Sequence, residues 1–171
     1  MEALPAPVAE PPILFGVQMP ADDELLPWAA AVERLIEART YWIASTRPDG
    51  RPHTRPVWGV WLEDGFWFST GSLARTNLPG NPEITVHLDT GDRPLIVEGT
   101  AQQVTDATDL ARFVAAYNPK YDWDVAVSDD GQVVDGSGAA GPAFRVRPRV
   151  VLGWETNMRA PTRWRFPSAA P

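Results

Sequence analysis

Polar and hydrophobic residues alternate with a period of two along much of the chain after residue 40, as they do in half-buried β-strands. The stretch TYWIAST at 40–46 is rich in aromatic and β-branched residues, which favour strands. Further strands are predicted at 52–61, 66–70, 83–89, 94–104, 143–155 and 162–166. The pattern therefore predicts a fold made mainly of short strands.

Turn sequences separate the first strands and indicate that they form hairpins. RPDG at 47–50 places proline at the second position of a β-turn and glycine at the last. EDG at 63–65 is a tight turn between the strands at 52–61 and 66–70. Strands that follow one another in hairpins are antiparallel, so we expect an antiparallel barrel.

Two segments show helical spacing instead. Pro27 suits the first helical position of one of them, and acidic residues at 22–24 lie near its positive end. The other is expected to begin at Thr105 and to stop before Pro119, because the residue before a proline disfavours a helix. Their apolar faces consist of Trp28, Val32, Leu35 and Ile36 in the first helix and Leu110, Phe113, Val114 and Tyr117 in the second.

The remaining segments show no regular pattern. Residues 1–20 include five prolines, and we expect a surface arm that packs on a neighbour or stays mobile. Residues 122–141 are acidic and glycine-rich, which predicts a loop or lid. The expected organisation is an arm over 1–20 and a single cofactor-binding domain over 21–171, mainly β (α+β) with two main flanking helices.

Composition excludes several classes of protein. The chain has no cysteine, so it has no disulfide framework and no thiolate metal site. It has no apolar run of about 20 residues and no basic, apolar leader, so we expect a cytoplasmic protein that does not enter membranes. The net charge of −7 opposes nonspecific binding to nucleic acid. Fourteen of the 15 basic residues are arginines, which suit phosphate or carboxylate binding but also follow from a GC-rich genome.

Most catalytic motifs are missing. The two histidines, His53 and His87, are far apart in sequence and predict only a weak metal site. The chain contains no GxSxG, GxxxxGK[ST] or GxGxxG motif. No side chain is therefore assigned a catalytic role; His53 could donate a proton if it faces a cleft, or be structural.

Tryptophans and one polar loop carry the remaining signal. Four of the eight tryptophans lie on the first strands, where they could line a cleft for a planar ligand or fill the core. The loop at 69–78 holds four hydroxyls, one guanidinium and a glycine before a helical turn. Such a loop can hold a phosphate, and it can equally be a solvated connection that caps the helix.

Together these segments resemble the pyridoxamine-phosphate-oxidase-like split β-barrel superfamily, in particular its flavin- and deazaflavin-dependent oxidoreductases. The likeness lies in TYWIASTRPDGRPHTRPVWGVWLEDGFWFST (40–70), RTNLPGNPEITVHL (75–88), VEGTAQQVTD (97–106), AYNPKYDW (116–123) and TRWRF (162–166). The resemblance implies a split β-barrel of antiparallel strands, FMN-binding-like, and a homodimer. Its cofactor, coenzyme F420 or FMN, would lie at the interface between the protomers.

The resemblance also implies which residues bind the cofactor. One strand would run along the ring, the polar loop would hold the phosphate, and residues near the C-terminus would approach the ring from either protomer. Lys120, Tyr121 and Trp123 would lie near the mouth of the pocket. The matching positions are Arg55, Pro56, Val57 and Trp58 for the ring, Ser69, Thr70, Ser72, Arg75 and Asn77 for the phosphate, and Trp154, Arg163, Trp164 and Arg165 near the C-terminus.

The phosphate segment departs from the family pattern at two positions. Relatives commonly read S-R-K-A-R-N-L, whereas this chain has Ala74 at the lysine position and Thr76 at the usual arginine position. Each lost cation removes a charge-assisted contact worth roughly 1.5–3 kcal/mol where it is desolvated. Arg75 could compensate from the neighbouring position; otherwise the phosphate is held weakly or the pocket takes another ligand.

Three functions follow as hypotheses. The first is an oxidoreductase that uses F420 or FMN for hydride transfer to a small organic acceptor. The second is a non-catalytic protein that binds or carries a flavin or haem, and the departures at Ala74 and Thr76 motivate it. The third is a barrel that serves only as a dimeric interaction module.

Overall fold

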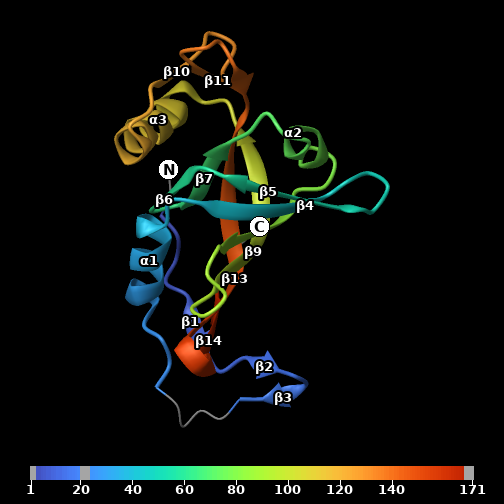
Figure 1. Cartoon of the computed structure of the whole chain (residues 1–171), viewed down its shortest axis with the longest axis vertical. Coiled ribbons are helices and arrows are strands. Elements are labelled where there is room, and N and C mark those ends of the chain that lie inside the picture. The colour runs from blue at the N-terminus through green and yellow to red at the C-terminus, as the bar shows by residue number, and fades with distance from the viewer. Residues whose placement is uncertain (1–2, 20–23, 168–171) are drawn as a thin grey trace.

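Strands dominate the computed structural model, which describes residues 3–19 and 24–167 (Figure 1). Three α-helices and one 3-10 helix accompany the strands in this part of the chain. The helices are α1 (Trp28–Glu37), α2 (Ala74–Asn77) and α3 (Ala107–Tyr121), with the 3-10 helix at Thr156–Met158. The strands are β1 (Val8–Glu10), β2 (Ile13–Leu14), β3 (Val17–Gln18), β4 (Tyr41–Thr46), β5 (Pro52–Val57), β6 (Gly59–Leu62), β7 (Gly65–Ser69), β8 (Glu83–Leu88), β9 (Leu95–Val104), β10 (Val125–Val127), β11 (Val133–Asp135), β12 (Ala140–Gly141), β13 (Ala143–Glu155) and β14 (Arg159–Arg165).

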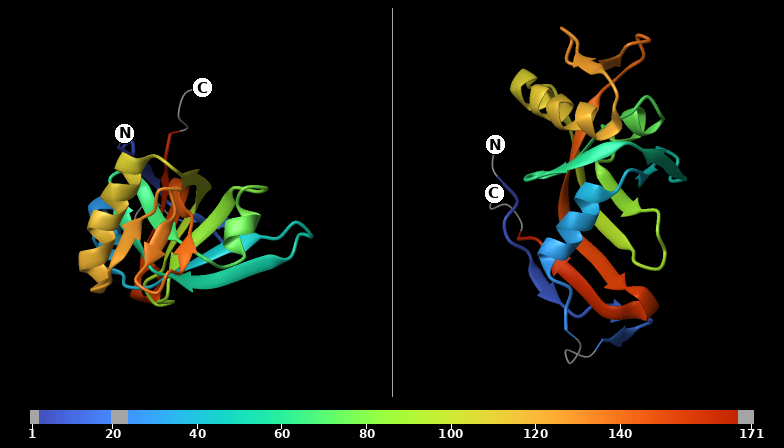
Figure 2. Two further views of the ribbon diagram at one scale, coloured as in Figure 1. Left: turned by 90° about the horizontal axis from the view of Figure 1, so that it is seen from above. Right: turned by 60° about the vertical axis from the view of Figure 1, so that its left-hand side comes forward.

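The main sheet has the strand order β1-β14-β13-β9-β8-β4-β5, and β6 and β7 join it through β7 and β13. Every pair in this sheet is antiparallel. Helix α3 and the small sheet β10-β11-β12 lie at one end of the molecule, whereas β1 and β14 lie at the other (Figures 1 and 2). The architecture confirms the predicted split β-barrel of antiparallel strands.

Strand β13 is shared by the two halves of the barrel. One of its edges pairs with β9 along nearly its whole length. Its other edge pairs first with β7, over residues 143–146, and then with β14, over residues 150–155. The register against β9 shifts between Pro148 and Val150, where a bulge bends the strand. The barrel splits at this point because the second edge changes its partner.

The predicted alternation along the strands matches their buried faces. In β4, Tyr41, Ile43 and Ser45 are buried, whereas the residues between them are only half-buried. Aromatic rings fill the interior: Phe68 stacks at 5.6 Å on Phe66 and at 5.5 Å on Phe144. The core is therefore built from one face of each strand.

Helix α1 differs in detail from its prediction. Pro27 is the N-cap rather than the first helical residue, and Ile36, expected on the buried face, is 51% exposed. Leu35 is buried as predicted, together with Ala31, and Trp28 and Val32 pack partly buried against the core. The predicted acidic residues Asp22 and Asp23 lie outside the described residues.

Three other predictions about elements are wrong. The strand expected at 52–61 is broken at Trp58 into β5 and β6. Helix α3 does not stop before Pro119 but continues to Tyr121, whose hydroxyl is anchored on the backbone of Gly59. These contacts hold the last turn of the helix, which ends where Asp122 adopts a φ of 50°. The segment expected to be a loop or lid at 122–141 contains the small sheet β10-β11-β12.

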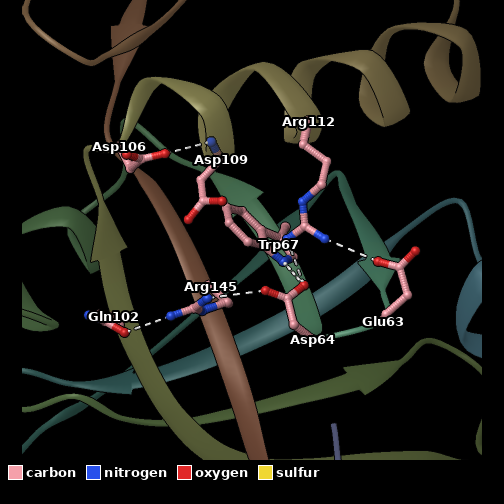
Figure 3. Close-up of polar contacts among 8 residues, drawn as sticks. All are labelled: Glu63, Asp64, Trp67, Gln102, Asp106, Asp109, Arg112 and Arg145. Atoms are coloured by element: carbon pink, nitrogen blue, oxygen red, sulfur yellow. Dashed lines mark hydrogen bonds and ion pairs between the residues drawn. The ribbon is translucent and has the colours of Figure 1, made fainter. Parts of the chain in front are cut away.

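A buried carboxylate ties four elements together (Figure 3). Asp64, in the turn between β6 and β7, is 1% exposed and accepts a hydrogen bond of 3.0 Å from Trp67 Nε1. Its oxygens also pair with Arg112 of α3 at 2.9 Å and with Arg145 of β13 at 3.1 Å. Arg145 reaches further to Gln102 of β9 at 2.9 Å. Two cations and an indole N–H thus compensate the burial of one negative charge.

None of the helices in the described ranges is both long enough and apolar enough to cross a membrane.

Candidate functional site

Strand β5 offers a free edge beside the predicted ring position. In the described sheets it pairs with β4 alone, so its other edge is open. Arg55 and Pro56 are exposed on this strand, whereas Val57 is buried. An open edge presents unpaired backbone N–H and C=O groups, which can bind the polar rim of a planar ring.

The polar loop after β7 is ordered by its own hydroxyls. Ser69 Oγ donates to Gly141 O at 3.1 Å, and Thr70 Oγ1 donates to Ser72 Oγ at 2.9 Å. Ser72 Oγ also accepts from the Ala74 amide at 3.3 Å, and Thr76 Oγ1 donates to Leu73 O at 2.9 Å. Among the described contacts of the four hydroxyls, only the Ser72 proton has no acceptor. Ser72 can therefore donate to an acceptor from outside the loop.

Helix α2 ties this loop to β4, the neighbour of the edge strand β5. Asn77 is buried, and its Nδ2 donates to Ser45 Oγ on β4 at 3.1 Å. Ser45 lies directly opposite His53 of β5 in the antiparallel pair. The end of the predicted phosphate loop is thus tied to β4, the strand that pairs with the predicted ring strand β5. Ser45 alternates with Tyr41 and Ile43 on the buried face of β4, and a polar residue at such a position indicates a buried hydrogen bond. The sequence analysis did not identify this contact.

His53 is buried rather than open to a cleft. Its side chain is 4% exposed, and no hydrogen-bond partner lies near Nε2 in the described structure. Burial lowers the pKa of His53, and the positive charges of Arg55 and Arg47 lower it further. The imidazole is therefore neutral at pH 7, which agrees with the structural alternative for this residue.

The departures from the family pattern differ in their environment. Ala74 is fully buried, so the lysine position is used for packing in this chain. Arg75 and Thr76 are exposed, and no carboxylate pairs with Arg75 among the described residues. Arg75 is consequently the cation available next to Ser72, and these groups fit a phosphate.

The predicted residues near the C-terminus lie apart from this loop. Trp164 is fully buried on β14 and packs edge-to-face on Trp28 at 5.6 Å. Arg163 and Arg165 pair with Glu10 of the N-terminal arm at 2.6 Å and 2.7 Å. Trp154 lies at the end of β13 near the turn into β14. Within one chain, β14 and α2 lie toward opposite ends of the molecule (Figure 1).

The three residues expected at the pocket mouth cluster around Tyr121. Trp58 stacks on the Tyr121 ring at 4.7 Å with an interplanar angle of 5°, and Trp123 meets Trp58 edge-to-face at 5.9 Å. Trp58 and Trp123 are 37% and 48% exposed. Lys120 Nζ lies 2.8 Å from Tyr41 Oη. An aromatic, cationic surface therefore follows directly after the ring strand.

No group of three or more histidine, aspartate or glutamate side chains in the described part of the chain is placed to hold a metal ion. The chemistry found near the predicted site consists of hydroxyls, the Arg75 guanidinium, an open strand edge and exposed aromatic rings. Such a set can bind a planar molecule that carries a phosphate.

Comparison with known proteins gives a family and a fold. A family model described as pyridoxamine 5'-phosphate oxidase matches residues 28–148. Similar solved structures include a conserved hypothetical protein from Mycobacterium tuberculosis, with 22% identity and a TM-score of 0.67 over 83% of this chain and 92% of that one. An F420 reductase has 25% identity and a TM-score of 0.51 over 70% of this chain and 94% of that one. HutZ, a heme storage protein from Vibrio cholerae, has 17% identity and a TM-score of 0.51 over 73% and 90% of the two chains. No curated protein matches the sequence.

Proposed function

Because the chain belongs to the pyridoxamine 5'-phosphate oxidase family, we propose that it is an oxidoreductase that binds FMN or coenzyme F420 and reduces a small organic acceptor. The observation that carries the proposal is the hydroxyl loop, which Asn77 ties to Ser45 of β4, the strand next to the open-edged β5. The likeness to an F420 reductase supports the deazaflavin, although the phosphate-binding groups suit either cofactor.

The chain's own residues would bind and orient the cofactor. Arg75 and the free hydroxyl proton of Ser72 would hold its phosphate, and the backbone of Arg55 and Val57 on β5 would contact the ring. A bound flavin or deazaflavin supplies the hydride chemistry. Oriented backbone N–H groups at the strand edge would stabilise negative charge on the ring. Trp58 would shield that end of the site from water.

We further propose that the working unit is a homodimer. The outer face of the sheet carries a row of adjacent residues, Pro56, Trp42, His87 and Ile96, on four neighbouring strands. Trp42 and His87 stack across strands at 6.5 Å, and none of the four side chains is fully buried. A partner protomer on this face would cover it and would bring a second copy of Arg163 and Arg165 toward the site.

The first experiment is a fluorescence titration of the protein with FMN and with coenzyme F420 in parallel. Saturable quenching of tryptophan by one of them is expected, because Trp58 lies next to the ring strand. Replacement Arg75→Ala should weaken that binding about 10- to 100-fold, because the phosphate loses its charged partner. Arg51→Ala, which removes an exposed guanidinium paired with Asp49, serves as the matched control.

An unchanged cofactor affinity in Arg75→Ala would contradict the assignment of this loop as the phosphate-binding site. Absence of binding by both cofactors at micromolar concentration would contradict the proposed function and favour the non-catalytic hypotheses.

Haem is the second candidate, and a specific contact favours it. His87 Nδ1 lies 2.8 Å from the Leu88 carbonyl, a contact that orients the ring and, in the neutral imidazole, puts the proton on Nδ1 so that Nε2 can ligate a metal. The likeness to a heme storage protein agrees with this reading. Haem addition would then give a Soret band that His87→Ala shifts or abolishes; an identical spectrum in the variant would contradict ligation by His87.

A further inference from the structure

The single lysine of the chain lies in an unusual environment. Lys120, near the end of α3, is half-buried, and its Nζ donates to Tyr41 Oη at 2.8 Å. Tyr41 is fully buried and donates its own proton to the Leu35 carbonyl, so its oxygen is oriented to accept from Lys120. Tyr41 Oη thus holds the amine in one position.

No negative charge compensates this amine. Within the described residues, no carboxylate lies within 4.0 Å of Nζ. Nζ lies instead 4.9 Å from the centre of the Tyr41 ring and 5.6 Å from that of Tyr121. Burial raises the pKa values of both phenols, so neither supplies a counter-charge at neutral pH. Burial also lowers the pKa of Lys120 to about 8, while the two rings favour its charged form.

The surface beside the amine suits an aromatic ligand. Tyr121, over which Lys120 lies, stacks on Trp58, and Trp58 meets Trp123 edge-to-face. Both tryptophans are partly exposed. The Arg39 guanidinium lies 5.7 Å from the Trp58 ring centre and 5.6 Å from the Tyr121 ring centre, and no carboxylate pairs with it in the described structure. Arg39 and Lys120 thus both lie against the buried Tyr121 ring, and Arg39 also lies against the partly exposed Trp58.

From this cluster we propose that Lys120 is a reactive amine that forms an imine with aromatic aldehydes carrying an acidic group. The lone pair of the neutral amine attacks the carbonyl carbon and a C–N bond forms. The carbonyl oxygen takes up the two protons that the amine nitrogen loses and leaves as water, as the C=N double bond forms. The imine nitrogen, once protonated, keeps the positive charge over the rings of Tyr41 and Tyr121. The acidic group of the ligand pairs with Arg39.

The test is reductive trapping with 4-carboxybenzaldehyde and sodium cyanoborohydride at pH 7.5, read by peptide mass spectrometry. Cyanoborohydride delivers hydride to the imine carbon, which leaves a stable secondary amine on the modified residue. A matched reference is the lysine introduced by Arg51→Lys, at a site where the side chain is 69% exposed. Lys120 should be modified at least about tenfold faster than this reference, because one pKa unit changes the neutral fraction about tenfold.

Equal or slower modification of Lys120 would overturn the proposal. The readout uses native protein without flavin or haem, so it does not depend on the proposed function. It also does not depend on whether a Lys120 variant folds.

The acidic group is tested by Arg39→Ala with two probes. The variant should slow labelling by 4-carboxybenzaldehyde about two- to fivefold, as expected for loss of an exposed ion pair. It should leave labelling by the neutral 4-(hydroxymethyl)benzaldehyde unchanged. An equal effect on both probes would overturn the assignment of Arg39 and of the anionic ligand class.

Discussion

Replacement Asp64→Ala is expected to destabilise the protein by about 3–5 kcal/mol, the range found when one partner of a buried ion pair is removed. The carboxylate is 1% exposed, and its loss leaves Arg112 and Arg145 without the anion between them. The indole N–H of Trp67, in a fully buried ring, loses its acceptor as well. The free energy of unfolding, measured by urea denaturation of the wild type and the variant, gives the effect directly.

The matched control is Asp49→Ala. Asp49 also pairs with an arginine, Arg51 at 2.7 Å, but its side chain is 52% exposed. Exposed pairs contribute about 0–1 kcal/mol, so the control should change stability little. Comparable losses in the two variants would show that burial of the Asp64 cluster has no special role.

The same carboxylate makes stability depend on acid pH. Burial by itself would raise the pKa of Asp64, but the hydrogen bonds from Trp67, Arg145 and Arg112 together lower it below the ordinary value. A depressed pKa in the folded state stabilises the protein above the unfolded-state value of about 3.9 and loses that contribution as the pH falls below it. Wild-type stability should therefore fall more steeply than that of Asp64→Asn below about pH 4. Parallel pH profiles would contradict this assignment.

Replacement Gly99→Ala is expected to cost about 3 kcal/mol, the upper end of the usual cost of overpacking. Gly99 lies on β9 opposite Pro148, next to the bulge where β13 changes its pairing partner. A Cβ atom at this position would lie 2.2 Å from the Arg147 carbonyl oxygen and 3.1 Å from Pro148 Cα. Both are backbone atoms of a sheet strand, so a side-chain rotation cannot relieve the contact. Thermal and urea unfolding measure the loss.

Gly91→Ala is the control for this substitution. Gly91 lies between β8 and β9, and an added Cβ there meets no heavy atom within 4 Å. Its stability should stay within about 0.5 kcal/mol of the wild type. If Gly99→Ala were equally mild, the β9–β13 pairing at the bulge would be looser than the structure indicates.

Local sequence patterns were sufficient for most strands of the barrel, but not for β1 or for the break between β5 and β6. The alternation at 40–46 reflects a strand with one buried face, and the turn at 47–50 connects it to its neighbour. Strand β13 has the bounds predicted from its alternation. Period and turn chemistry act between residues close in sequence, so no tertiary contact was needed to recognise them. The family resemblance then predicted how these strands assemble.

The sequence also suggested residues for a candidate site, and their role stays a prediction. They are the hydroxyl loop, Arg75 and the strand with Arg55; the structure ties the loop to β4, the neighbour of that strand. Arg163 and Arg165 can belong to the same site only if a second protomer brings its copies of them there. In one chain they pair with Glu10, far along the sheet from α2.

Contacts between residues distant in sequence decided the features of the fold that local patterns did not predict. The break at Trp58 and the continuation of α3 past Pro119 both depend on Tyr121 Oη, which bonds the backbone of Gly59, 62 residues away. The buried Asp64 cluster joins residues separated by 48 and 81 positions, and the turn motif at 63–65 does not reveal its arginines. The environment of Lys120 likewise depends on Tyr41, 79 residues earlier. The sequence by itself determined the elements with local periodicity and the family. The tertiary structure alone decided which charged side chains are buried and which groups they pair with, because desolvation depends on the packing of the whole chain.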